Sequence, residues 1–273
     1  MKTVLTSQSA KVQPAAAVGV TTPDVRSHAG SGLAVLIIAA GLLLWEALVA
    51  WRELPVYILP APSRIVQTLL ENPQTYAEAS AITLLEAFLG LFLGGLAGAL
   101  LAVLLSFWPR IESGVMALAI LVKSTPLVAI APLLTIWLGF GVFPKVLITA
   151  LITFFPVLVN LLAGLQAVEA AYLDTFRSWH ASRAEIFWHL RIPQALPYLF
   201  AGLKVSGPLA LIGAVVAEWT GASGGLGRVM WLAYANLNLP YLFAAVFVLS
   251  AAGMALYLLL NWLENKIIFW RQA

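Results

Sequence analysis

Few side chains in this 273-residue sequence are of the types that make or break covalent bonds. There is no cysteine, so disulfides and thiolate-bound metals are excluded. The three histidines, His28, His180 and His189, form neither a paired cluster nor the HExxH motif of a helical zinc site. The sequence therefore predicts a protein that is not an enzyme and binds no metal. Any energy for uphill work must come from elsewhere.

The glycine-rich stretch GASGGLG, residues 221–227, contains letters that also occur in two catalytic motifs. It lacks the spacing and the terminal Lys-Ser/Thr of a P-loop, which cradles nucleotide phosphates. Gly221, Ser223 and Gly225 spell GxSxG, but a hydrolase needs that serine on a strand-to-helix elbow with acid and histidine partners. No histidine follows it. We interpret the stretch as a flexible turn.

A polar segment interrupts the apolar second half of the chain between Glu169 and Pro193. Its pattern predicts two short amphipathic helices with a break near His180–Ser182. Ser182 and Glu185 have the spacing of a capping box at the start of the second helix, and Pro193 and Pro197 are expected to end that helix and start the next span. The pattern alone leaves two interpretations open: a helical hairpin lying on lipid headgroups, or a docking surface for another protein.

The amino-acid composition indicates whether these residues are held in a water-soluble protein or in a membrane protein. Hydrophobic residues make up 62% of the chain and charged residues 10%, with a mean hydropathy of +0.94. A soluble domain is about 45–50% apolar and about 25% charged, so the protein is expected to lie in lipid. The net charge of +3 is scattered, and without a basic stripe no nucleic-acid partner is expected.

Six stretches are long and apolar enough to cross a bilayer, whose core needs roughly 20 residues of helix. We therefore predict an all-α membrane protein with about six transmembrane helices. The connection from Glu53 to Asn72 contains three prolines and is expected to hold a short amphipathic helix. The predicted spans are Gly32–Ala50, Ser80–Phe107, Gly114–Leu138, Val142–Leu165, Leu196–Ala217 and Pro240–Leu263.

The distribution of Lys and Arg predicts the orientation. With the N-terminus in the cytoplasm, ten basic residues fall inside and four, among them Lys145, fall outside, with Lys123 set aside within a span. Both termini and the polar segment are then cytoplasmic. A cleaved secretory signal is not expected, because the first thirty residues lack an apolar core. The expected organisation is a tail (1–31), a first helix with an external loop (32–78), a core (79–265) that includes the polar segment (about 168–193), and a second tail (266–273).

Ionisable residues inside the spans are candidates for function, because a charge in lipid is costly. Glu46 and Glu86 either lie near a pathway or pair with a neighbouring helix. Lys123 stands beside Ser124, Thr125 and Pro126, where a kinked helix would expose polar groups to a pathway. The predicted translocation-pathway residues are Lys123, Ser124, Thr125 and Glu218.

The polar segment resembles the EAA loop of permease subunits from ATP-binding-cassette (ABC) importers, whose pattern is E-A-A-x3-G-x9-I-x-L-P. The literal Glu169-Ala170-Ala171 would place the glycine of that pattern on Thr175. Starting at Asp174 aligns the glycine with His180 and the closing Leu-Pro with Ile192-Pro193. We adopt the second register, because it matches the acid, both aliphatic positions and the proline. Glycine there permits a positive φ, and histidine is among the other residues enriched in that region.

The resemblance extends over about Ala79–Leu263. It is carried by KSTPLVAIAPLLTIWLGFG (123–141), FFPVLVNLLAGL (154–165), ALPYLFAGLK (195–204) and GAVVAEW (213–219). These stretches are similar to permeases grouped with sulfonate, nitrate and taurine importers. Within that group, KSTPLVAIAPLL is most similar to permeases for pyrimidine thiamine precursors and riboflavin.

The resemblance implies a type I ABC importer permease (MetI-like) fold in the bacterial inner membrane. It also implies a second copy of the subunit or a homologous permease, a dimer of cytoplasmic ATPase subunits, and a soluble binding protein outside. ATP and Mg would be used by the ATPase, and this chain would bind no cofactor. The polar segment would be the ATPase-coupling loop, with Asp174, Thr175, Phe176, Arg177, Ser178, Trp179, His180, Ala181, Ser182, Arg183, Glu185, Ile186, Phe187, Leu190 and Pro193 as its expected residues.

Two other classes of membrane protein would require different sequence features. A secondary transporter would carry its own ion-coupling site and often an inverted repeat, and no such repeat is evident. A membrane-embedded enzyme would need convergent acid, base or metal ligands in its spans. A secondary transporter would leave the large polar segment unexplained, and the spans contain no convergent set of ligands of the kind that an enzyme would need.

Overall fold

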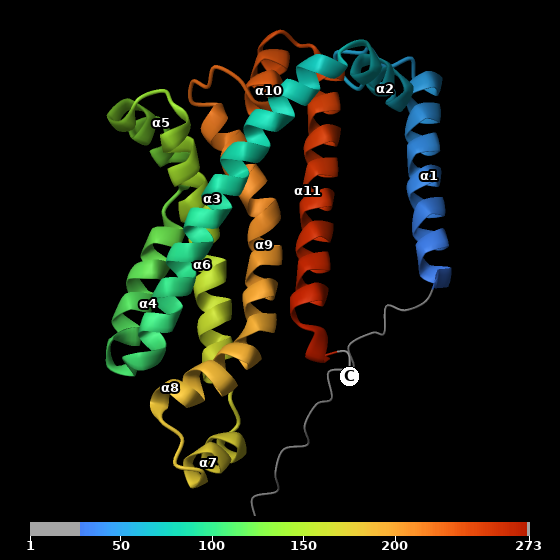
Figure 1. The fold of residues 1–273 in the computed structure, drawn as a ribbon. Coiled ribbons are helices and arrows are strands. Elements are labelled where there is room, and N and C mark those ends of the chain that lie inside the picture. The colour runs from blue at the N-terminus through green and yellow to red at the C-terminus, as the bar shows by residue number, and fades with distance from the viewer. Residues whose placement is uncertain (1–27, 272–273) are drawn as a thin grey trace, which may run out of the picture. The chain divides into compact units, whose positions relative to one another are not determined.

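The computed structural model describes residues 28–271, and every regular element in that range is helical (Figure 1). The chain divides into two compact units, Met1–Trp45 and Glu46–Ala273. Most of the predicted N-terminal tail lies outside the described residues. The helices are α1 (His28–Trp51), α2 (Pro62–Glu71), α3 (Pro73–Phe107), α4 (Pro109–Ser124), α5 (Leu127–Leu138), α6 (Val142–Gln166), α7 (Ala170–Ser178), α8 (Arg183–Ile186), a π-helical turn (Phe187–Arg191), α9 (Ile192–Glu218), α10 (Leu226–Ala235), α11 (Leu239–Ile267) and a 3-10 turn (Phe269–Arg271).

Five helices in the described range are each long and apolar enough to span a membrane: α1, α3, α6, the continuous helix Arg183–Glu218, and α11. The predicted span Gly114–Leu138 is instead two helices, α4 and α5, bent by 87°. There are six spans if this bent pair counts as one. The break lies at Thr125, whose backbone is extended (φ −72°, ψ 130°). Proline disfavours helical geometry in the residue before it, so Pro126 turns the predicted kink into a break.

The long helices α3, α6 and α9 form the centre of the second unit, and α6 contacts both of the others. Gly90, Gly94 and Gly98 recur every four residues along α3 where it meets α6. A Cβ atom on Gly94 would overlap Thr153 Oγ1 and the carbonyl oxygen of Ala150. Small residues let membrane helices approach closely, so this row of glycines sets the separation between α3 and α6.

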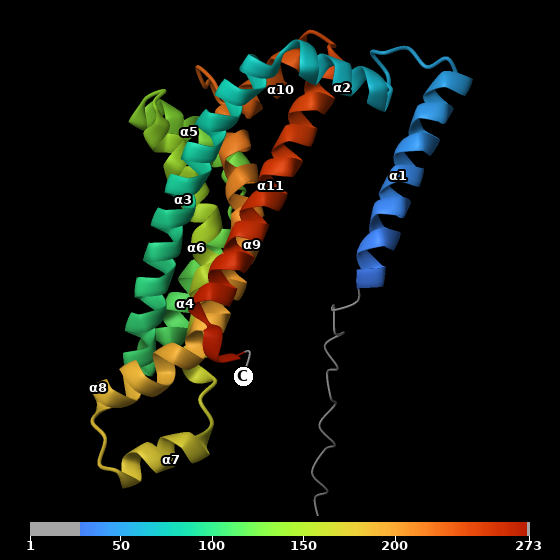
Figure 2. The ribbon, with the colours of Figure 1, turned by 45° about the vertical axis from the view of Figure 1, so that its right-hand side comes forward.

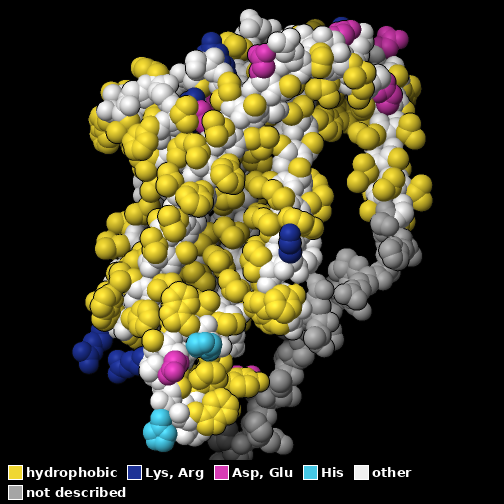
Figure 3. Space-filling model, in the orientation of Figure 1, with side chains coloured by type: hydrophobic (Ala, Val, Ile, Leu, Met, Phe, Trp, Pro, Cys, Tyr) yellow, Lys and Arg dark blue, Asp and Glu magenta, His cyan; other side chains and the backbone are white. Residues whose placement is uncertain are grey.

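The two ends of the second unit differ in what they carry. Both ribbon views place α7 and α8 at one end, called here the α7 end, and α2 and α10 at the opposite end, the α10 end (Figures 1 and 2). Between them, the visible face of the helices is covered mostly by hydrophobic side chains (Figure 3). The predicted amphipathic helix after Glu53 is confirmed as α2, and Glu46 accepts hydrogen bonds at its start from Ser63 N (2.9 Å) and Ser63 Oγ (2.7 Å).

Candidate functional site

The polar loop Glu169–Pro193 has the helix–break–helix structure that the sequence predicts. α7 ends at Ser178, the break covers Trp179–Ser182, and α8 begins at Arg183. The capping box is confirmed: Glu185 N donates to Ser182 Oγ (3.2 Å), and Ser182 N donates to Glu185 Oε2 (2.7 Å). These bonds satisfy amides that a helix start otherwise leaves without partners, so the break has a defined geometry.

His180 lies two residues beyond the end of α7, with a positive φ of 57°. Its amide donates to the carbonyl oxygen of Arg177 (2.9 Å), and the amide of Ala181 donates to that of Phe176 (3.0 Å). This pair of bonds is the Schellman motif, in which glycine usually occupies the left-handed residue. The left-handed residue is therefore His180, and Thr175 lies within α7, which supports the register that starts at Asp174.

Replacing His180 with glycine should stabilise the end of α7 by about 1 kcal/mol, because glycine adopts a left-handed conformation without the Cβ penalty. Hydrogen exchange of the backbone amides of residues 180 and 181 should be slower in this variant than in the wild-type protein. Ala181→Gly is the matched control, since Ala181 has no positive φ, and it should speed the exchange. Faster exchange in His180→Gly would contradict the assigned geometry.

The end of the loop differs from the sequence prediction. We expected Pro193 and Pro197 to separate the second loop helix from the next span, but α8, the π-helical turn and α9 form one continuous helix from Arg183 to Glu218. The π turn has an Ile192 N to Phe187 carbonyl bond, which shifts the hydrogen-bond pattern just before Pro193. Because the π-helical turn already alters the regular hydrogen-bond pattern at this point, Pro193, which has no amide hydrogen, is accommodated without a break.

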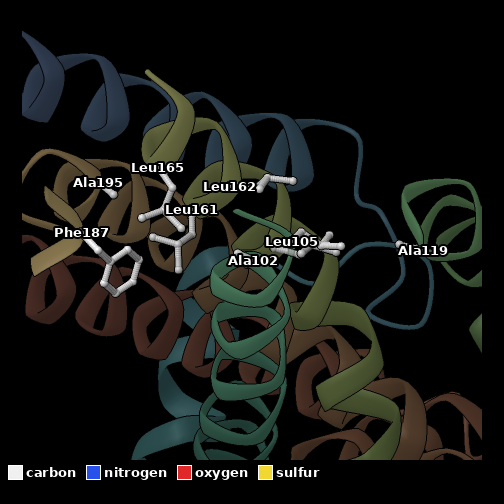
Figure 4. Packing of buried hydrophobic residues seen from close by; sticks show 9 residues of the cluster. Ala102, Leu105, Ala119, Leu161, Leu162, Leu165, Phe187 and Ala195 are labelled. Carbon is white, nitrogen blue, oxygen red and sulfur yellow. The ribbon is translucent and has the colours of Figure 1, made fainter. Parts of the chain in front are cut away.

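The predicted loop contacts divide by exposure. Phe187 is buried among Leu161, Leu165 and Ala195 (Figure 4), and its ring lies 4.9 Å from that of Phe107. It therefore anchors the loop to α3 and does not face outward with the other aromatic residues. Asp174, Thr175, Arg177, Ser178, Trp179, His180, Ser182, Arg183 and Glu185 are exposed, and Phe176, Ala181, Ile186, Leu190 and Pro193 are half-buried.

Three of the predicted pathway residues lie together at the break between α4 and α5. Lys123 and Ser124 are exposed in the single chain, and Thr125 is half-buried. Lys123 Nζ lies 4.6 Å from the ring centroid of Phe155, near the middle of α6. The break thus places a cation and two hydroxyl groups on the surface between the two ends of the unit.

Glu218, the fourth predicted pathway residue, belongs instead to a buried polar cluster with Thr83, Glu86 and Lys145. Each of the four is at most 5% exposed. Lys145 Nζ donates to Glu86 Oε1 (2.8 Å), and Thr83 Oγ1 donates to Glu218 Oε1 (2.7 Å). The prediction counted Lys145, near the start of its span, among the basic residues on the outer side, whereas its side chain is buried within the protein and paired with Glu86. The sequence did contain a signal for this cluster, because three apolar helices each carry one of its charges, and the charges are of both signs: Glu86, Lys145 and Glu218.

The Glu218 carboxyl group holds the connection between α9 and α10. It accepts a hydrogen bond from Gly227 N (2.5 Å), while Thr83 Oγ1 accepts one from Leu226 N (2.8 Å). Gly225 has a φ of +102°, and a Cβ atom on Gly225 or Gly227 would collide with the Glu218 side chain. The GASGGLG stretch is therefore a turn fitted around Glu218, not the flexible turn that its glycines suggested.

Within residues 28–271 the protein consists of apolar helices and the exposed polar loop Glu169–Pro193. This architecture is that of a multi-pass membrane protein. Residues 90–269 match the family described as the binding-protein-dependent transport system inner membrane component. The chain belongs to this family. It is therefore a transport subunit and not an enzyme, and ATP hydrolysis belongs to a separate subunit.

The relatives are transport permeases of similar length. The chain is 35% identical to a probable ABC transporter permease protein of Haemophilus influenzae, over 86% of this chain and 96% of that protein. It is 33% identical to the formylaminopyrimidine transport permease protein ThiX of Halalkalibacterium halodurans, over 85% and 92%. Relatives named for riboflavin, aliphatic sulfonate and taurine transport are 29%, 28% and 27% identical.

A solved amino acid ABC transporter shows a similar fold. The match has a TM-score of 0.59 at 19% identity and covers 76% of this chain and 98% of the other. The predicted type I ABC importer permease fold is thereby confirmed.

Proposed function

We propose that this chain, with a second copy of itself or a homologous permease, forms the translocation pathway of an ATP-driven importer for a small solute. The observation that carries the proposal is the exposed loop Glu169–Pro193, held by a Schellman motif and a capping box and anchored through Phe187. A loop built in this way transmits force as a rigid body, which a lipid-surface hairpin has no need to do. An ATPase dimer that closes on two such loops would rotate the helices attached to them.

In this proposal the α7 end faces the cytoplasm. Arg110, Arg177, Arg183 and Arg191 lie at or beside this end, and basic residues near span ends favour the cytoplasmic side. Lys145, now placed inside the chain, no longer counts for the opposite side. The α10 end would then face a soluble binding protein, and the distribution of Lys and Arg in the sequence favours cytoplasmic termini.

The ATPase would contact the exposed residues of Asp174–Arg183. Trp179 is 71% exposed in the single chain and packs at 5.7 Å against the ring of Phe176. Arg177 forms a salt bridge with Asp174 (3.1 Å) and, with Arg183 and Glu185, would supply the polar rim of an interface. This chain would bind no cofactor, because ATP and Mg would be used by the partner.

Lys123, Ser124 and Thr125 would line the pathway. The exposure of Lys123 and Ser124 at the break between α4 and α5 supports this assignment, since an irregular backbone within a membrane lies where it is buried in protein or faces a cavity. Glu218 is buried within the chain, so a pathway role for it would be indirect, through the position of α10.

The proposed solute is a pyrimidine thiamine precursor or riboflavin. Support comes from KSTPLVAIAPLL and from the 33% identity to the relative named for formylaminopyrimidine transport. Import of a sulfonate, taurine or nitrate is the second candidate, because relatives named for sulfonate and taurine are nearly as similar as the one named for riboflavin.

A ligand screen of the cognate binding protein tests the solute, with pyrimidines, flavins and sulfonates in one panel. The same protein added to vesicles that contain the permease and its ATPase should drive uptake of the bound ligand only with ATP. Tight binding of a sulfonate alone would favour the second candidate. Uptake that persists without ATP and stops with an ion gradient would indicate a secondary transporter instead.

A further inference from the structure

The buried polar cluster contains two carboxyl groups but only one basic group. Lys145 forms a salt bridge with Glu86 (2.8 Å), and Glu218 is joined to the same face of α3 through its hydrogen bond with Thr83 (2.7 Å), three residues before Glu86. Arg228, a basic residue on α10, is bonded to the backbone instead, because it donates to the carbonyl oxygen of Ala222 (2.5 Å). With both carboxyl groups ionised, the cluster would hold a net negative charge inside the protein, which is strongly unfavourable without a partner.

One oxygen of the cluster also lacks a donor. Glu86 Oε1 accepts from Lys145, but Glu86 Oε2 is fully buried and receives no hydrogen bond from any residue in the described range. Both oxygens of Glu218 already accept bonds, from Thr83 and from Gly227. Thr83, which bonds Glu218, lies three residues before Glu86 on the same buried face of α3. A proton on Glu218 would therefore lie on the side of α3 where Glu86 Oε2 lacks a donor.

We propose that Glu86 and Glu218 hold one proton between them, which makes the cluster with Lys145 neutral and fastens the connection between α9 and α10 to α3. Two adjacent carboxyl groups in a shared site cannot both ionise readily, and sharing a proton relieves their repulsion. The proton is a resident part of the structure and is not transported. Its loss would leave two repelling carboxylates with a single cation in a buried cluster.

Infrared spectroscopy of the full-length permease in lipid tests the proposal. At a pH where exposed carboxyl groups are ionised, the wild-type protein should show the carbonyl stretch of a protonated carboxylic acid, and the band should shift in D₂O. Glu86→Gln and Glu218→Gln should each abolish this band, because either variant leaves one carboxylate to pair with Lys145. Lys145→Met should strengthen it, because both carboxyl groups then need a proton.

Glu78→Gln is the control, since Glu78 lies on the same helix but is exposed, and it should leave the band unchanged. Absence of the band from the wild-type protein would overturn the proposal, and that measurement does not depend on the folding of any variant. Persistence of the band in either glutamine variant would also overturn it. ATP-driven uptake should be unaffected by a protonophore, whereas inhibition would show that the proton moves with the solute and contradict its resident role.

Discussion

Replacing Trp179 with alanine should reduce ATP-driven import roughly 30-fold or more, while the amount of permease in the membrane stays unchanged. Trp179 is 71% exposed at the break of the loop, so its removal costs the single chain little packing beyond its contact with Phe176. A tryptophan buried in the centre of an interface commonly contributes about 2 kcal/mol or more, and every 1.4 kcal/mol corresponds to about tenfold. Uptake into vesicles, normalised to permease content, measures the effect.

Trp108→Ala is the matched control for this prediction. Trp108 is 56% exposed between α3 and α4, near the same end of the molecule but outside the loop. Its loss should leave import within about twofold, because an exposed side chain away from an interface core contributes little. Equal loss of import in both variants would mean that Trp179 has no special contact with the ATPase.

Replacing Gly94 with alanine should destabilise the permease by about 3 kcal/mol. The added Cβ atom would overlap Thr153 Oγ1 and the backbone carbonyl group of Ala150, and a backbone group cannot move aside unless α3 and α6 separate. The loss of stability is measured by thermal unfolding in detergent, followed by size-exclusion chromatography.

The neighbouring residue provides the control. A Cβ atom on Gly95 would meet only Leu203 Cδ2 at 3.5 Å, an ordinary van der Waals contact. Gly95→Ala should therefore be neutral or stabilise α3 by up to about 1 kcal/mol, the advantage of alanine over glycine in a helix. If the two variants unfold at the same temperature, the glycine row does not set the separation of α3 and α6.

Features that depend on residues close together in the sequence could be predicted from it. The apolar spans follow from composition over about 20 residues, and the capping box of Ser182 and Glu185 involves residues three apart. The left-handed residue at His180 followed from the register of the EAA pattern. The sequence analysis predicted a kinked helix beside Pro126, whereas the structure has a complete break at Thr125. This break is also a local feature, because a proline disfavours the helical conformation in the residue before it.

Features that depend on distant residues could not be predicted. Lys145 pairs with Glu86, 59 residues away, and Glu218 bonds Thr83, 135 residues away. Only the packing of α3, α6 and α9 brings them together. The inward direction of Phe187 depends in the same way on Phe107 and the end of α3. The glycine row of α3 is an intermediate case. Its repeat every four residues indicates close packing against another helix, but the sequence does not show that this helix is α6.

In the proposed importer, the loop Glu169–Pro193 transmits force from an ATPase. A photo-crosslinking side chain placed at Trp179 in the assembled importer tests this most directly. We expect a crosslink to the ATPase subunit whose yield changes between the nucleotide-free and ATP-bound states, while the same side chain at position 108 gives little. Crosslinks from Trp179 to phospholipid alone, in both nucleotide states, would contradict it.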